Sequence, residues 1–166
     1  MVALTEEMKT AFRTMKAFPV ATASKGGWPN VVPIGFVELV DDETIWIADN
    51  FMKKTLANIQ ENPKISIYVW GGPETKGCFQ VKGDVEIRSS GPEFEKMQFT
   101  VHSKMAKAPA KNLLIVKIRE VYECSPPDRR PGGRRYFNFF LRDPCRDLSW
   151  TISAAHVGSD RRNPSS

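Results

Sequence analysis

Apolar residues recur along this chain with two different periods, and the helical period comes first. Positions spaced three and four residues apart predict an amphipathic helix over residues 4–18, which Thr5 would cap and Pro19 would end. These positions are Leu4, Met8, Ala11, Phe12 and Met15. The same spacing predicts two more helices, over residues 50–61 and 89–104.

Between these segments apolar and polar residues alternate with a period of two, which predicts six β-strands. The predicted strands cover residues 18–24, 30–39, 44–48, 64–70, 78–88 and 112–124. Short strands with even turn spacing and no alternation of strands with helices favour a small closed antiparallel barrel. The predicted fold class is therefore mainly β (α+β).

Several of these strands carry large apolar side chains on both faces. Ile45, Trp46 and Ile47 are one example, and residues 67–70 are another. A sheet with one wet face should alternate more cleanly, so we expect one face of the barrel to be buried against a second copy of the chain. The expected assembly is a homodimer.

Charge and composition divide the chain after Cys124. Residues 125–166 contain eight Arg and four Asp but no Lys or Glu, and they carry most of the net charge of +5. We therefore predict a domain over residues 1–124 and an irregular Arg-rich tail over residues 125–166. The run 129–143 has the composition of a nucleic-acid-binding segment, but a charge cluster on a tail is usually solvated, so nucleic acid is not the expected partner.

Other protein classes are excluded or disfavoured by what the sequence lacks. No stretch approaches the roughly 18 consecutive apolar residues of a membrane helix, and the first residues do not resemble a secretory signal, so a cytoplasmic protein is expected. The three cysteines are odd in number and far apart in sequence, which favours reduced thiols. With two histidines, the chain offers no site of several imidazoles.

The junction between the third strand and the second helix is the first candidate for chemistry. A helix N-terminus attracts anions, and Lys53, Lys54 and Thr55 supply the charges and the hydroxyl that a phosphate monoester needs. On spacing alone, a solvated helix face is the competing interpretation. A second candidate is the stretch 32–35, where a proline inside a strand indicates an edge whose free backbone groups could face a ligand.

Other residues that often carry chemistry have a structural interpretation here. Trp46, Tyr68, Trp70 and Phe79 could stack on a planar ring, although aromatic residues in strands are more often core or interface. His102 has no carboxylate or nucleophile beside it in sequence and is expected to be a surface or packing residue.

Three segments follow one another over most of the chain: FPVATASKGGWPNVVPIGFVEL, TIWIADNFMKKTLANIQENPKISIYVW and GCFQVKGDVEIRSSGPEFEKM. In this order they resemble the FMN-binding split-barrel proteins of the pyridoxamine 5'-phosphate oxidase-like superfamily. The resemblance runs from the first helix to Cys124. It is closest to the small single-domain members, whose strand-to-helix junction and GPEFE segment are matched by Lys54-Thr55 and by residues 91–95.

The resemblance implies a six-stranded antiparallel split β-barrel with short flanking helices, and FMN as cofactor. Lys54 and Thr55 would hold the flavin phosphate, the backbone of residues 32–35 would face the isoalloxazine ring, and Cys78 stands where the oxidases proper tend to have a glutamine. The implied cofactor-binding residues are Val32, Pro33, Ile34, Gly35, Asn50, Lys53, Lys54, Thr55 and Cys78. Two FMN molecules would lie in the groove between two subunits.

The resemblance further implies an oxidoreductase or electron-transfer protein that acts on a small acceptor. True pyridoxamine phosphate oxidases have a C-terminal segment whose arginine and histidine bind substrate, and no match for it follows Cys124, so that oxidation is not expected. A non-catalytic flavin carrier or sensor, or a binder of a deazaflavin or haem in the same groove, stays open as an alternative.

Overall fold

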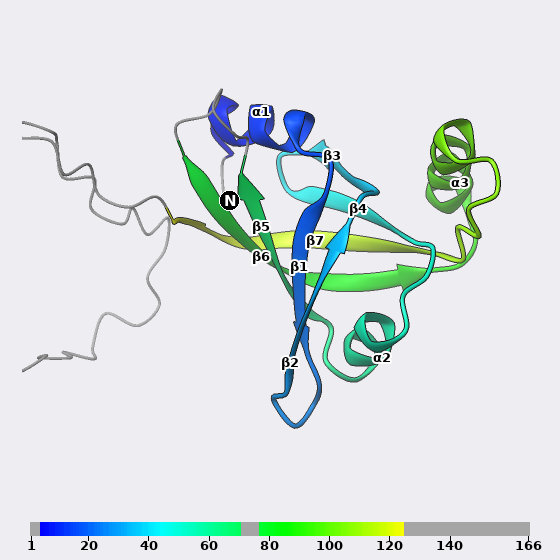
Figure 1. The fold of residues 1–166 in the computed structure, drawn as a ribbon, viewed down its shortest axis with the longest axis horizontal. Coiled ribbons are helices and arrows are strands. Elements are labelled where there is room, and N and C mark those ends of the chain that lie inside the picture. The colour runs from blue at the N-terminus through cyan, green and yellow to red at the C-terminus, as the bar shows by residue number, and fades with distance from the viewer. Residues whose placement is uncertain (1–3, 71–76, 125–166) are drawn as a thin grey trace, which may run out of the picture.

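A curled sheet of seven antiparallel strands dominates the part of the chain that the computed structural model describes, residues 4–70 and 77–124 (Figure 1). The helices in these ranges are α1 (Glu6–Thr14), α2 (Lys54–Glu61) and α3 (Pro92–Lys104). The strands are β1 (Phe18–Ala23), β2 (Pro29–Ile34), β3 (Val37–Asp41), β4 (Thr44–Asp49), β5 (Lys64–Trp70), β6 (Cys78–Arg88) and β7 (Asn112–Glu123). The predicted fold class is confirmed, with seven strands in place of six.

The additional strand comes from a break inside the predicted strand over residues 30–39. The sheet order is β2-β1-β5-β6-β7-β4-β3, so β2 pairs with β1 at one edge while β3 pairs with β4 at the other. Gly35 and Phe36 connect the two, and so short a link requires the sheet to curl until its edges approach each other. The two edge strands, β2 and β3, do not pair with each other in the described part of the chain, so the barrel is split rather than closed.

The two apolar faces of β4 are both covered within one chain. Ile45 and Ile47 belong to the core inside the curl, whereas Trp46 and Ala48 pack in a second core that contains the α3 residues 94, 97 and 101. The two faces of β4 therefore give no evidence for a second subunit, because α3 covers the outer one, and the homodimer stays a prediction. On β5 the outward residues Tyr68 and Trp70 are exposed, at 38% and 56%.

The helices begin and end at positions that differ from the predicted bounds. Thr5 caps α1 as predicted, with its Oγ1 accepting the Met8 N–H at 3.3 Å. The helix ends at Thr14, before Pro19, because Phe18 belongs to β1 and stacks on Phe12 with ring centroids 5.6 Å apart. None of the helices among the described residues has the length and apolar character to span a bilayer.

Candidate functional site

A buried carboxylate fixes the connection between β4 and α2. Asp49 is fully buried, and its Oδ1 accepts the Met52 N–H at 3.0 Å while its Oδ2 accepts from the Asn112 side chain at 2.7 Å. The Asp49 backbone oxygen also accepts the Lys111 N–H at 2.8 Å. Asp49 thus holds the turn that leads into α2 and ties it to β7, which explains why the helix begins at Lys54 rather than at Asn50.

The N-terminus of α2 is uncapped and basic. Its N-cap residue, Lys53, makes no capping hydrogen bond with its side chain, and the first turn contains no acidic residue. The Ala57 N–H donates to the Lys53 oxygen at 3.0 Å in the first turn of the helix, so the three preceding N–H groups point out of the helix end. Lys53 and Lys54 are exposed and take part in none of the ion pairs between described residues.

Polar side chains, together with the apolar Ile59, connect this helix to β1 and β2. The Asn30 amide donates to Thr55 Oγ1 at 3.1 Å and to Thr22 Oγ1 at 3.3 Å. Asn58 donates to the same Thr22 oxygen at 3.1 Å, and its own Oδ1 is buried without a hydrogen-bond partner among the described residues. Thr22, Asn30, Thr55 and Asn58 form what we call the polar cluster. Sequence reasoning found Thr55 alone of these four.

Asn50 has a structural contact on the other side of the junction. Its Oδ1 accepts the N–H of Ala110 at 3.0 Å, and Ala110 has a left-handed backbone with φ of 40°. Asn50 therefore anchors the connection between α3 and β7. Its carbonyl oxygen is engaged there, so a contact between Asn50 and a ligand would have to come from its amide nitrogen or its backbone.

The candidate backbone stretch, residues 32–35, runs alongside the same junction. At one end of β2, Asn30 is bonded to Thr55, and just beyond the other end the Phe36 oxygen accepts the Ala48 N–H at 3.1 Å. Val32 is half-buried, Pro33 and Gly35 are exposed, and Ile34 is buried. Residues 32–35 thus lie between a contact with α2 at Asn30 and a contact with β4 at Phe36.

Cys78 lies elsewhere in the chain. It pairs with Trp70 at the far end of β5, whereas α2 contacts the opposite end, where the Asn62 amide donates to the Ala23 oxygen at 3.3 Å. The seven residues of β5 separate these two ends by about 20 Å. Within one chain, Cys78 and Lys54 therefore do not share a site.

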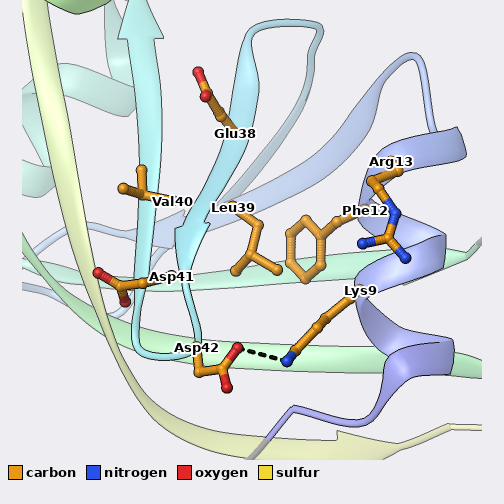
Figure 2. A pocket seen from close by; sticks show the side chains of 8 residues that line it. All are labelled: Lys9, Phe12, Arg13, Glu38, Leu39, Val40, Asp41 and Asp42. Carbon is orange, nitrogen blue, oxygen red and sulfur yellow. Dashed lines mark ion pairs between the residues drawn. The ribbon is translucent and has the colours of Figure 1, made fainter.

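Two hollows adjoin the sheet. One, of about 340 Å³, lies beside Gly35 and is lined by Phe36, Trp46 and Met97, with Lys16 and Lys104 among its polar residues. The other, of about 410 Å³, lies between α1 and β3. Figure 2 shows that Phe12 and Leu39 point toward each other inside it while Lys9 is paired with Asp42 at 2.8 Å. Figure 1 places α1 and α2 at opposite ends of the molecule, so this second hollow is remote from the α2 junction.

The other residues that the sequence analysis considered for chemistry do not lie at the α2 junction. Trp46 and Phe79 are buried, which confirms the core interpretation for these two. His102 is exposed, and its Nε2 lies 3.0 Å from the Ala108 oxygen. The Arg-rich tail, with its predicted irregular character, lies outside the described residues.

Known protein sequences are similar to this chain over the residues that form the fold. The profile of the pyridoxamine 5'-phosphate oxidase family matches residues 4–125. The chain belongs to this family. It is also 36% identical over 134 residues to the uncharacterized protein MJ0282 of Methanocaldococcus jannaschii, a match that covers 76% of this chain and 85% of that protein.

Solved structures show the same fold. HupZ of Group A Streptococcus superimposes with a TM-score of 0.66 at 26% identity, covering 73% of this chain and 94% of that one. An FMN-binding protein of Syntrophomonas wolfei gives 0.59 at 22% identity, covering 73% and 88%. The fold also occurs in an F420 reductase and in the haem storage protein HutZ of Vibrio cholerae, each with a TM-score of 0.56, at 17% and 16% identity.

Proposed function

We propose that this protein binds FMN and passes electrons between the flavin and a small acceptor. The observation that carries the proposal is the uncapped, lysine-flanked N-terminus of α2 beside the edge strand β2. Family membership supports it, because the fold is shared with the FMN-binding protein of Syntrophomonas wolfei. The proposal does not include oxidation of pyridoxamine phosphate, because the sequence has no match for the C-terminal segment with which the true oxidases bind that substrate.

The residues at the start of α2 suit a phosphate. Three N–H groups and the positive end of the helix dipole would face the phosphate oxygens, and Lys53 and Lys54 can reach them from the exposed side. Thr55 accepts from Asn30 with its oxygen, which leaves its hydroxyl hydrogen to donate. Because Thr55 is 2% exposed, its main contribution would be to hold the helix start in place through the polar cluster.

The backbone of β2 suits the polar edge of a flavin ring. As an edge strand it is hydrogen-bonded to β1 on one side, and its other side presents N–H and C=O groups that no strand of the described part covers. Pro33 removes one donor from this row. The 340 Å³ hollow beside Gly35, with Lys16 and Lys104 among its lining residues, would accept a small acceptor.

A bound flavin supplies hydride and electron transfer itself, so the chain contributes position and electrostatics. The second subunit remains part of this proposal, with each flavin in the groove between two copies of the chain. A contact between the flavin and Cys78 would then come from the partner copy, since Cys78 and α2 lie at opposite ends of β5. Light scattering of flavin-loaded protein at micromolar concentration tests this arrangement, and a monomer would contradict it.

Removal of the Lys54 charge is the direct test of the phosphate site. A hydrogen bond to a charged group contributes roughly 1.5 to 3 kcal/mol, so Lys54→Ala should weaken FMN binding by about tenfold to a hundredfold. Riboflavin lacks the phosphate, so its affinity should change little. Flavin fluorescence titrations with both ligands measure the difference.

Lys25→Ala is the matched control for the lost charge. Lys25 is also exposed, but its N–H lies 3.3 Å from Glu61 Oε2, at the opposite end of α2. This variant should bind FMN like the wild type. Equal losses for FMN and riboflavin in Lys54→Ala, or no loss for FMN, would assign Lys54 to a solvated helix face.

The alternative ligands share a planar ring and an anionic group, and the same fold occurs in an F420 reductase and in a haem storage protein. Among the described residues the sole imidazole is that of His102, which lies at the end of α3 against the Ala108 oxygen rather than at the α2 junction. This placement favours a flavin over a histidine-ligated haem. An absorption spectrum of the purified protein distinguishes FMN, a deazaflavin and haem.

A further inference from the structure

Cys78 and Cys124 lie directly opposite each other at the end of the β6–β7 ladder. The register pairs Phe79 with Glu123, and one position further along the Cys124 N–H donates to the Cys78 oxygen at 2.8 Å. Side chains of directly opposed residues in an antiparallel pair project to the same face. The fold therefore brings together two thiols that are 46 positions apart in sequence.

Both thiols are accessible to a small oxidant. Phe79 points into the core, so its neighbour Cys78 points to the outer face of the sheet, where it is partly exposed, and Cys124 is exposed. A hydrogen bond to Cys78 raises the pKa of Tyr68 to about 12, with burial and the charges of both cysteines contributing less. Tyr68 thus reports the state of the thiol pair.

The expected spacing is compatible with a disulfide under slight strain. Cα atoms of a hydrogen-bonded antiparallel pair are about 5.5 Å apart, within the roughly 4.4 to 6.8 Å found for disulfides. In a hydrogen-bonded pair the Cβ atoms lie toward the upper end of the range of about 4.5 to 5.5 Å, whereas a disulfide needs roughly 3.5 to 4.5 Å, so the two strand ends must close by about 1 Å. Because β7 ends at Glu123 and β6 begins at Cys78, a small closing movement here would not disturb a continuing ladder.

We propose that Cys78 and Cys124 form a reversible cross-strand disulfide by exchange with a low-molecular-weight disulfide such as oxidised glutathione. The Cys124 thiolate attacks one glutathione sulfur, which forms a mixed disulfide and releases one glutathione thiolate. The Cys78 thiolate then attacks the Cys124 sulfur and releases the second glutathione. Two protein thiols are oxidised, one glutathione disulfide is reduced to two thiols, and the two protons pass from protein to glutathione.

Exposure and strain make such a bond easy to reopen, as is typical of regulatory rather than structural disulfides. Burial is the main cause that raises the pKa of the Cys124 thiol, with the neighbouring Cys78 adding to it, so the exchange should be faster at higher pH. The disulfide would tie β6 to β7 immediately before the Arg-rich tail begins. The proposal does not rest on flavin binding.

The test uses the full-length chain with Cys145→Ser, which leaves these two cysteines alone. After incubation with oxidised glutathione, we expect both thiols to be lost from a thiol count, a non-reduced digest to contain one peptide pair joined through Cys78 and Cys124, and no glutathione to be retained. The melting temperature should rise by about 5 °C. Millimolar reduced glutathione should restore both thiols and the original melting temperature.

Adding Cys124→Ser to this background gives the matched control. The remaining Cys78 should then retain glutathione as a mixed disulfide or stay reduced, and no peptide pair joined within the chain should form. Stable glutathione adducts on both thiols of the two-cysteine protein, links between chains, or unreacted thiols would overturn the proposal. A disulfide that reduced glutathione cannot reopen would overturn its reversibility.

Discussion

The helices α1 and α2 begin in opposite ways. The start of α1 is complete within the chain. Thr5 caps it, the negative charges of Glu6 and Glu7 interact favourably with the positive end of the helix dipole, and Met8 is buried in the core. The start of α2 has no side-chain cap, no acidic residue and two exposed lysines. Positive side chains at a helix N-terminus are unfavourable by a few tenths of a kcal/mol or more. A bound anion at the start of α2 would remove that penalty, whereas the start of α1 carries no such penalty.

The buried faces of the two helices differ in the same sense. The buried residues of α1 are Met8, Ala11 and Phe12, whereas those of α2 are Thr55, Asn58 and Ile59. Apolar packing is non-directional, but the hydrogen bonds of the polar cluster fix the position of α2 on β1 and β2. A helix that must present its N–H groups to a ligand benefits from being held by directional contacts. The following predictions test this contrast.

The largest effect is expected for Asn58→Asp. Asn58 is fully buried, and its Oδ1 already lacks a partner among the described residues, so a carboxylate there would lose solvation and the donor to Thr22. We expect the free energy of unfolding to fall by about 3 kcal/mol. Asn62→Asp, the same change at the half-buried C-cap of this helix, loses one bond to the Ala23 oxygen but keeps access to water, so it should cost about 1 kcal/mol or less. Urea unfolding measures both, and equal losses would contradict the role of the polar cluster.

A smaller effect of opposite sign is expected for Lys53→Asp. An acidic N-cap residue should stabilise α2, and we expect the unfolding free energy of the ligand-free protein to rise by about 1 kcal/mol. FMN binding should weaken at least tenfold, because a negative charge would replace a positive one beside the proposed phosphate site. Thr5→Asp is the control at the complete helix start, with a stability change expected within about 0.5 kcal/mol. A Lys53→Asp variant that gains no stability would show that α2 does not lack a cap.

The smallest effect is expected for Asp42→Asn, which removes the partner of Lys9 on α1 in Figure 2. The hydrogen bond to Asp42, with a smaller one to Glu6, raises the pKa of Lys9. The pair therefore stabilises the fold at neutral pH, where both groups are charged, and this contribution is lost as the pH rises through the raised pKa of Lys9. We expect the melting temperature to fall by no more than about 2 °C at pH 7. The difference should shrink in 1 M salt, where the screening length falls to about 3 Å, and a salt-independent loss would contradict the ionic explanation.

Features encoded by neighbouring residues were predictable from the sequence. The Thr5 cap, the existence of the three helices and the basic helix start after β4 all follow from short-range patterns. The division of the predicted strand at Gly35 was not predictable, because residues 31–37 form an almost unbroken apolar run. The strands β2 and β3 are separate only because β2 pairs with β1 and β3 pairs with β4. The second face of β4 was misassigned for the same reason, since α3 lies about 45 residues further along the chain.

The cofactor-binding residues that the resemblance implies stay a prediction. Sequence reasoning singled out Thr55 at the α2 junction but missed Thr22, Asn30 and Asn58, the other members of the polar cluster. A polar residue at a buried position of a strand or helix, such as Thr22 between Val20 and Ser24, is the signal that could have indicated them. The pairing of Cys78 with Cys124 depends on the register of β6 and β7, including a shift between Lys82 and Gly83, which no sequence spacing predicts.

The short connection between β2 and β3 has a consequence for how the chain folds. The hairpins β1–β2 and β3–β4 can form locally, but they are joined at Gly35 and Phe36 while three later strands must enter the sheet between them. The pairings that complete it join Val20 to Ile67 and Thr44 to Lys117, which are 47 and 73 positions apart. Closing such long loops costs entropy before their contacts form, so folding should be slow for a domain of this size, on the order of milliseconds to seconds. The final step would be the entry of β7 between β6 and β4, which closes the core around a chain that is otherwise already arranged.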